Sequence, residues 1–297
     1  MALSDNLRGI LLMCASMLAF VLNDTLVKAV THAGMPLFQA ITLRGMVATL
    51  ALLVIAWRSG GLNLWPAGRD RVYLGLRTVG EIGASLFFLL ALVHMPLANL
   101  SAIMQSLPLA VTLAAAALLG APIGWRRLVA ISVGFVGVMI IIRPGAAEFD
   151  QWSLMGLGSV AFVVLRDLAT RQFSRSLPST TGAIWASLSV MLMGLAGIAF
   201  QGWQPVSLTG VAEILGAAAF LIIGYISAIK VMRVGDLGVV APFRYTSLLW
   251  AIVMGWLLFG TLPDGWTVLG SAIVVASGLY MLVRERKRRL ETALTPA

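Results

Sequence analysis

Two pairs of opposite charge interrupt the apolar stretches of this sequence with the same spacing. Asp24 is followed four residues later by Lys28, and Asp167 four residues later by Arg171. On a helix this spacing puts the acid and the base on one face, in the order that favours pairing. Ionisable groups at membrane depth are costly and are therefore candidate functional residues. We predict that these pairs, with Arg166 beside the second one, form gates at the two ends of a transport path. The alternative is a local ion pair near each helix end.

Three further ionisable residues in apolar stretches suit a small charged ligand. Arg77 and Glu81 are also four residues apart, and Arg44 stands in the stretch before them. A guanidinium group binds a carboxylate through two parallel hydrogen bonds, and a carboxylate such as that of Glu81 binds an ammonium group. These residues therefore predict a cavity for a zwitterionic metabolite. The alternative is that they neutralise one another as buried structural ion pairs.

Two prolines, Pro108 and Pro242, interrupt apolar stretches in the two halves of the chain. Proline removes a backbone donor and kinks a helix, and broken helices at corresponding places mark the binding region of many transporters. Trp185 lies within another apolar stretch and is a candidate for an apolar wall. The alternative for the prolines is a packing kink, and for the tryptophan a contact with lipid or with the protein core. The residues that we expect to line a cavity near the two breaks are Gln105, Pro108, Arg244 and Tyr245.

The composition of the chain indicates that these residues are carried by membrane-spanning helices. The chain is 60% hydrophobic and only 11% charged, whereas an average soluble domain carries roughly 25% charged residues. This excludes an ordinary cytosolic enzyme, a nucleic-acid-binding domain and a disordered chain. We predict an all-α integral membrane protein with ten transmembrane helices, each about 20 residues long. The predicted spans are approximately 8–30, 37–57, 72–93, 98–119, 127–142, 153–171, 180–200, 211–232, 238–259 and 266–283.

The distribution of basic residues predicts the orientation. If the N-terminus is cytoplasmic, most of the 21 Lys and Arg fall in the cytoplasmic segments, and only Lys28 and Arg143 fall in the outer ones. This bias, with an even number of spans, places both termini in the cytoplasm. The basic tail from Arg284 to Arg289 is most simply an anchor on anionic lipid.

The sequence lacks the motifs of enzymes and of resident cofactors. It has no nucleotide-binding loop and no His-Glu-x-x-His, and its single cysteine, Cys14, forms neither an intrachain disulfide nor a thiolate metal site. We predict no enzymatic activity, no cofactor, no metal and no nucleic-acid partner. The predicted partners are a small-molecule substrate and the lipid bilayer.

The two halves of the chain share a pattern. Several residues of the first half recur about 140 residues later, in the same order: Gly120, Gly124, Trp125, Leu128, Gly137 and Arg143 as Gly260, Gly265, Trp266, Leu269, Gly278 and Arg284. We predict two five-helix repeats, 1–145 and 146–297. An odd number of spans inverts the second repeat, an arrangement typical of secondary transporters. The fifth and tenth spans are rich in small residues that permit close packing, which predicts a scaffold or the seam of a homodimer; the chain is a monomer or such a dimer.

This organisation resembles the drug/metabolite transporter superfamily, EamA family, over essentially the whole chain. The segments that carry the resemblance are Leu43-Arg44-Gly45, Met95-Pro96-Leu97-Ala98, Arg143-Pro144-Gly145, Arg166-Asp167-Leu168-Ala169-Thr170-Arg171 and Ala241-Pro242-Phe243-Arg244-Tyr245. The resemblance implies a basket of helices around a central cavity and alternating-access transport of small metabolites. Characterised bacterial members include exporters of aromatic and other amino acids and carriers for S-adenosylmethionine uptake.

We therefore expect a secondary active transporter that moves amino acids, aromatic or apolar ones first, outward across the inner membrane by alternating access. Uptake of S-adenosylmethionine or of another charged metabolite or drug is the alternative within transport. A membrane scaffold or receptor without flux is the alternative of another class.

Overall fold

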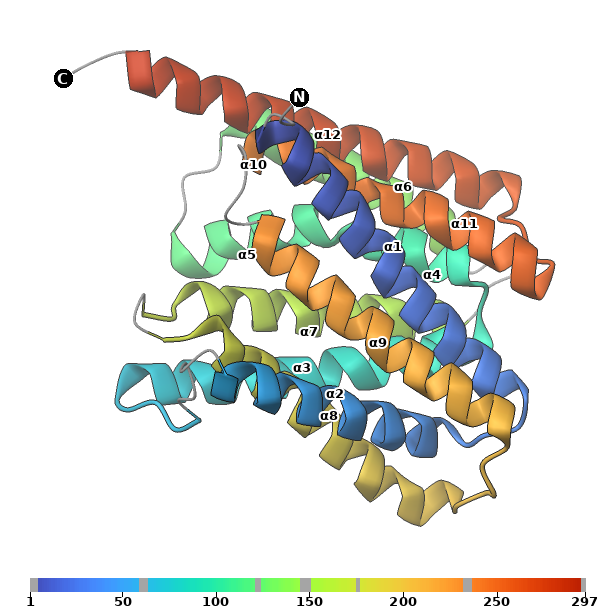
Figure 1. Cartoon of the computed structure of the whole chain (residues 1–297). Helices are drawn as coiled ribbons and strands as arrows, with labels where there is room; N and C mark the ends of the chain where they lie inside the picture. Colours follow the sequence, from blue (N-terminus) through green and yellow to red (C-terminus); the bar gives the residue numbers. More distant parts are fainter. Residues whose placement is uncertain are drawn as a thin grey trace. The chain divides into compact units, whose positions relative to one another are not determined.

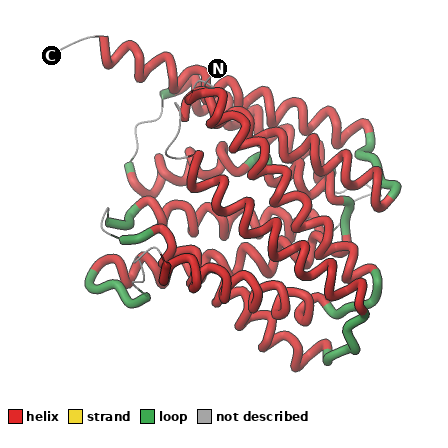
Figure 2. The backbone as a smooth tube through the Cα atoms, viewed as in Figure 1, coloured by secondary structure: helices red, strands yellow, loops and turns green. Residues whose placement is uncertain are grey.

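A computed structural model describes residues 5–58, 64–120, 124–144, 151–174, 177–231 and 237–294. These residues form helices joined by short connections and contain no strand (Figures 1 and 2). Ten helical stretches among them are long and apolar enough to cross a membrane. The predicted all-α membrane fold with ten spans is confirmed.

The helices begin and end close to the predicted spans. They are α1 (Asp5–His32), α2 (Leu37–Arg58), α3 (Arg69–His94), α4 (Leu97–Met104), α5 (Leu107–Leu119), α6 (Trp125–Ile142), α7 (Trp152–Arg171), α8 (Ser179–Gln201), α9 (Leu208–Val231), α10 (Leu237–Val240), the 3-10 helix η1 (Ala241–Tyr245), α11 (Thr246–Phe259) and α12 (Gly265–Leu294). Gly120 ends α5 and Gly260 ends α11, both with a φ of 63°. Glycine adopts this left-handed conformation without a steric penalty, so the recurring glycines terminate corresponding helices of the two halves.

Two predicted spans are interrupted where proline occurs. The fourth consists of α4 and α5, separated by a tight turn at Gln105 and Ser106, and Pro108 follows in the first turn of α5. The ninth consists of α10, η1 and α11, with Pro242 in the first turn of η1. Proline has no backbone N–H to donate and its ring clashes with the preceding turn. The helix therefore tightens next to each proline.

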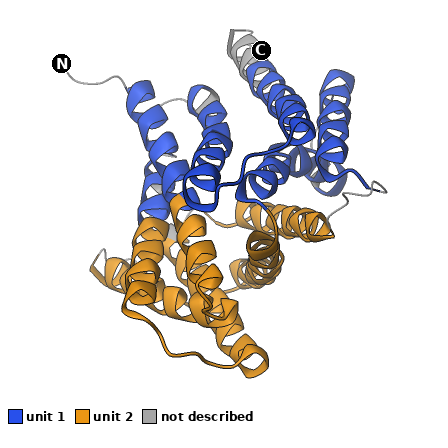
Figure 3. Cartoon of the chain, turned by 90° about the vertical axis from the view of Figure 1, so that its right-hand side faces the viewer, with its two compact units in different colours: residues 1–21, 96–150, 223–297 blue, residues 22–95, 151–222 orange. Residues whose placement is uncertain are grey.

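The helices gather into two compact units (Figure 3). Unit 1 comprises residues 1–21, 96–150 and 223–297, and unit 2 comprises residues 22–95 and 151–222. Each unit contains helices from both halves of the sequence. Three pairs of corresponding helices pack against each other, α2 with α8, α4 with α11 and α6 with α12, whereas α3 packs against α7, which is not its counterpart. The units are therefore not the sequence repeats, and the repeat boundaries stay a prediction.

In unit 1, α6 and α12 approach closely at glycines. A side-chain carbon added at Gly270 of α12 would lie 2.5 Å from the carbonyl oxygen of Gly137 on α6, and one added at Gly137 would lie 2.8 Å from the carbonyl oxygen of Gly270. Lipid tails are as apolar as side chains, so such helices associate through close packing of small residues. Within one chain these helices pack against each other; a scaffold role and a homodimer through them both stay predictions.

In unit 2, α3 and α7 approach closely in the same way. A side-chain carbon added at Gly158 of α7 would lie 2.5 Å from the ring of Phe87 on α3, and the ring of Phe162 on α7 occupies the space beside Gly83 of α3. The two rings lie 5.4 Å apart, centroid to centroid. Each ring thus fills the space that a glycine leaves on the opposite helix, which fixes the register of α3 against α7.

The α2 and α8 helices of unit 2 are joined by a polar contact. The hydroxyl of Thr49 donates to that of Ser187 at 2.9 Å, and Gly45 lies against Met191, which a side-chain carbon at position 45 would approach to 2.8 Å. Hydrogen bonds between membrane helices contribute about 0.6 kcal/mol. A hydrogen bond and close packing at a glycine therefore both hold the pair together.

Asp264 caps α12 at its N-terminus. Its carboxylate accepts the backbone N–H of Thr267 at 2.9 Å and forms an ion pair with Arg143, which follows α6. Partial burial opposes ionisation of Asp264, but the hydrogen bonding from Thr267 and the charge of Arg143 outweigh it and hold the pKa of Asp264 below its usual value. The contact ties the end of α6 to the start of α12.

We predict that Gly270→Ala destabilises the chain by about 1–3 kcal/mol, because the added methyl group overpacks the contact with α6. The measurement is thermal unfolding in detergent. Gly265→Ala is the matched control in the same helix, since nothing lies within 4 Å of a side-chain carbon there. Equal unfolding temperatures for the two variants would contradict the close approach.

We predict that Asp264→Asn lowers stability at neutral pH by up to about 1 kcal/mol, the value of an exposed ion pair. Asparagine also caps helices, so the difference from wild type isolates the charge. A lowered pKa gives stability that is fully present above the ordinary carboxyl pKa of about 3.9 and is lost as the pH falls through the lowered value. Unfolding curves of the two proteins should therefore converge below about pH 4. A constant difference at acid pH would argue against the ion pair.

Candidate functional site

Glu81 lies between two arginines in unit 2. Its carboxylate is 3.5 Å from Nη1 of Arg77, one turn earlier on α3, and 3.7 Å from Nη1 of Arg166 on α7. The side chains of Glu81 and Arg77 are only 8% and 12% exposed. The predicted pairing of Arg77 with Glu81 on one helix face is present, and α7 adds a second cation that the spacing within α3 does not reveal.

Small residues bring these charges together. A side-chain carbon added at Gly80 would lie 2.8 Å from the backbone nitrogen of Arg166, so α7 reaches α3 only because position 80 is glycine. On α8, Gly182 faces the guanidinium group of Arg77, with Nε 3.5 Å from where a side-chain carbon would lie. The charged cluster thus depends on glycines in two neighbouring helices.

Arg166 extends this cluster to Asp167. Its Nε and Nη2 both lie 3.0 Å from the same oxygen of Asp167. Arg77, Glu81, Arg166 and Asp167 therefore form one cluster of two acids and two bases, which we call the α3–α7 charge cluster. Arg171, the predicted partner of Asp167, is exposed in the last turn of α7.

Asp24 takes part in a similar arrangement between α1 and α2. The amide nitrogen of Asn23 donates to Asp24 at 2.9 Å, and the amide oxygen of Asn23 accepts from Nη1 of Arg44 at 3.1 Å. Asn23 and Arg44 are buried. In both repeats the residue before the aspartate, Asn23 or Arg166, binds it and reaches a charged residue of another helix. Asn23 was not among the predicted site residues, although its position one residue before a repeated aspartate could have indicated it.

Lys28 is held at the C-terminal end of α3. Its ammonium group donates to the carbonyl oxygens of Leu92 at 2.7 Å and Met95 at 2.5 Å. The last carbonyl groups of a helix lack partners within the helix and carry partial negative charge. The contact provides hydrogen-bond acceptors for the buried ammonium group and a donor for the carbonyl groups at the end of α3. It therefore favours a structural role for Lys28.

In unit 1, a hydrogen bond joins the two interrupted spans. Gln105, at the end of α4, donates through Nε2 to the hydroxyl of Ser247 on α11 at 2.8 Å. Both Gln105 and Ser106 are buried. Gln105 is a predicted site residue, whereas Ser247, two residues after the predicted Tyr245, was not predicted. Pro108 lies just beyond this contact, and Arg244 is exposed.

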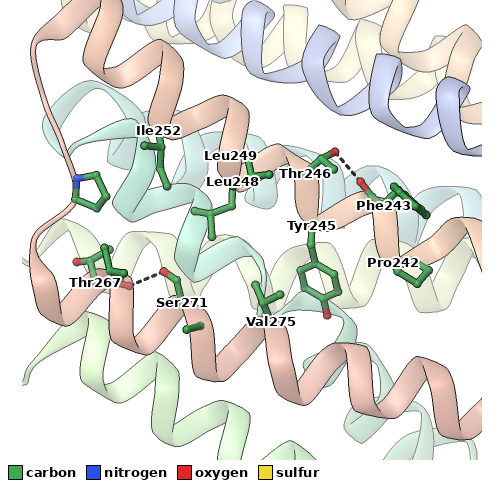
Figure 4. Close-up of a pocket in the computed structure, with 13 residues that line it drawn as sticks. Pro242, Phe243, Tyr245, Thr246, Leu248, Leu249, Ile252, Thr267, Ser271 and Val275 are labelled. Atoms are coloured by element: carbon green, nitrogen blue, oxygen red, sulfur yellow. Dashed lines mark hydrogen bonds between the residues drawn. The ribbon is translucent and has the colours of Figure 1, made fainter.

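Tyr245 lines a groove of about 370 Å³ between α11 and α12. The other lining side chains carry no charge, and Figure 4 shows the tyrosine ring reaching from η1 toward α12. Its hydroxyl occupies space that Gly278 leaves open. Within the part of the chain that the structure describes, this buried hydroxyl has no hydrogen-bond partner. An amphipathic or aromatic molecule with one polar group matches this lining.

Trp185 lies near the start of α8, under the connection between α2 and α3. Its indole N–H donates to the carbonyl oxygen of Leu64 at 2.8 Å, and its ring meets that of Trp65 edge to face at 5.1 Å. These contacts account for the ring and its polar atom.

The structure thus gathers Arg77, Glu81, Arg166 and Asp167 in one cluster, and Trp185 lies outside that cluster. Among the described residues, no three His, Cys, Asp or Glu side chains are placed to hold a metal ion.

Comparison with known proteins gives the chain a family context. The model of the EamA-like transporter family matches residues 7–143 and again 150–284. The riboflavin transporter of Vibrio cholerae is 27% identical over 95% of both chains, and the S-adenosylmethionine uptake transporter of Rickettsia prowazekii is 26% identical over 96% of both. The pseudopaline exporter CntI of Pseudomonas aeruginosa is 24% identical over 91% of this chain and 94% of its own. A crystal structure aligns with a TM-score of 0.63 at 19% identity, over 95% of this chain and 98% of that one, and shows the same fold.

We predict that Glu81→Gln costs about 3 kcal/mol of stability, because it leaves two arginines without their shared acid. Arg77→Gln should cost less, since Arg166 still neutralises Glu81. The double variant should lose less than the sum of the two single losses, which a double-mutant cycle of unfolding measures. Arg69→Gln, an exposed arginine of the same helix, is the control and should change stability by less than about 0.5 kcal/mol. Additive losses would show that Arg77 and Glu81 do not interact.

Proposed function

Because the chain belongs to the EamA-like transporter family, we propose that this transporter of small metabolites carries zwitterionic ones, amino acids first, by alternating access. The observation that carries the proposal is the position of Glu81 between Arg77 and Arg166. An amino acid presents a carboxylate and an ammonium group, and this cluster holds a partner for each.

The α3–α7 charge cluster contains buried polar atoms that are available to hydrogen-bond a ligand. Nη1 of Arg77 and Oε2 of Glu81 are buried, and in the described parts of the chain neither forms a hydrogen bond. Buried polar atoms without such bonds cost free energy. A substrate carboxylate on Arg77 and an ammonium group on Glu81 recover that cost, so binding is favoured at these two atoms.

The two repeated aspartates suit a gating role. Asp24 connects through Asn23 to Arg44, and Asp167 connects through Arg166 to Glu81. Alternating access needs contacts that form on one side of the membrane while their counterparts open on the other. We assign Asp24 with Lys28, and Asp167 with Arg171, to these opposite sides, with both chain termini in the cytoplasm of a bacterial cell.

Export is the first candidate direction, and uptake of a charged metabolite such as S-adenosylmethionine is the second. The second is favoured by the relative named as an S-adenosylmethionine uptake transporter, which matches 96% of this chain. The first has support from the relative named as a pseudopaline exporter. S-Adenosylmethionine also carries an amino-acid head group, so the α3–α7 charge cluster suits both candidates.

Counterflow into proteoliposomes tests the proposal without regard to direction. Vesicles preloaded with unlabelled phenylalanine, S-adenosylmethionine or riboflavin are diluted into the labelled compound. We expect saturable counterflow of phenylalanine, and a loss on the order of tenfold or more in Arg77→Lys, which keeps the charge but not the two-pronged hydrogen bonding. Arg69→Lys on the same helix is the matched control and should transport normally.

Each other result has a defined meaning. Counterflow of S-adenosylmethionine without phenylalanine would select the second candidate, and counterflow of riboflavin alone would overturn the zwitterion proposal. An unchanged Arg77→Lys variant would remove the charge cluster from the substrate path. No counterflow of any of the three by a folded protein would support a scaffold or receptor without flux.

A further inference from the structure

A second groove of unit 1 lies on the other side of α12, between the start of α6 and the end of the membrane-spanning part of α12. It encloses about 400 Å³. Its wall on α6 includes Trp125, Arg126, Val129 and Val133, and its wall on α12 includes Ser277 and Tyr280. The groove therefore has a charged and aromatic mouth above an apolar floor.

Two arginines supply positive charge at this mouth. The guanidinium group of Arg126 lies 5.2 Å from the ring centre of Trp125, and Arg284 donates to the hydroxyl of Tyr280 at 3.3 Å. The first turn of α6 contains no acidic residue. The two cations come from different helices and meet the same groove, one directly and one through a tyrosine hydroxyl.

The mouth coincides with a predicted membrane surface. Arg126 is in the first turn of the candidate span Trp125–Ile142, and Arg284 ends the candidate span Gly265–Arg284. Tryptophan and tyrosine prefer the boundary between lipid and water, so the rings of Trp125 and Tyr280 fit this depth. Below them, Val129 and Val133 continue into the apolar part of the span.

We propose that this groove binds an anionic phospholipid, with its phosphate between Arg126 and Arg284 and an acyl chain along the valines of α6. Basic pockets between membrane helices recognise anionic lipid head groups. The groove between α11 and α12 offers a contrast, because its lining in Figure 4 has no basic residue. The apolar floor commits the site to a lipid, since a soluble phosphate has nothing to place there.

Native mass spectrometry of the full chain, released from nanodiscs of equal phosphatidylcholine and phosphatidylglycerol, tests the inference. We expect wild type to retain phosphatidylglycerol preferentially. Arg126→Gln and Arg284→Gln should each lower that preference about fivefold, and the double variant about 25-fold if the two contributions are independent. Arg126→Lys should keep it, because a phosphate also accepts a lysine as a point charge.

Arg8→Gln is the matched control, since Arg8 is an exposed arginine at the first turn of α1 in the same unit. Equal retention of both lipids by wild type would overturn the proposal. So would a loss of preference in Arg8→Gln as large as in Arg126→Gln, because that would reflect overall charge. Displacement of the lipid by millimolar glycerol phosphate would also overturn it, since the head group alone would then suffice. Thermal unfolding in phosphatidylcholine alone verifies that the glutamine variants are folded.

Discussion

The cost of placing charge in an apolar environment organises unit 2 of this protein. An ionised side chain inside a membrane helix needs a partner, and here the partners come from other helices as well as from the same one. Lys28 satisfies that need at the carbonyl groups that end α3, and Arg166 satisfies it at two acids. The contacts of Lys28 with α3 and of Arg166 with Glu81 each tie two helices together at a fixed level. The charges therefore contribute to determining which helices are neighbours.

Close helix packing makes these contacts possible. Gly80 lets the backbone of α7 approach α3, which carries Arg166 to Glu81. In a bilayer there is little hydrophobic gain from packing one helix on another, so small residues and good fit must supply the association. The contact of Gly137 with Gly270 does the same for α6 and α12, which hold no charged residue from Leu128 to Ile142 or from Trp266 to Val283. Close packing at glycines therefore brings charged residues together between α3 and α7, and between α6 and α12 it joins two apolar helix faces.

The sequence predicted the number and approximate limits of the spans because hydropathy and length determine them directly. It also predicted the pairing of Arg77 with Glu81, since helix spacing determines which residues of one helix share a face. The pairing of Asp167 with Arg166 was not predicted, and neither was the place of Asn23 beside Asp24. Those contacts depend on the side-chain conformations of adjacent residues and on which neighbouring helix supplies a further partner. The spacing of residues along the chain contains no information about which helices are neighbours.

The two repeats differ where the charge cluster lies. Gln105 and Ser247 are 142 residues apart, within the offset between the repeats, so their hydrogen bond joins equivalent positions. If the repeats exchange conformations, a contact between equivalent positions is kept in both states. Glu81 itself has no such counterpart, because the residues 140 to 143 positions later, 221–224, are Leu-Ile-Ile-Gly. Under the alternating access that we propose, the ion pairs of Glu81 stabilise one of two otherwise related states, and a substrate that replaces them shifts the balance toward the other.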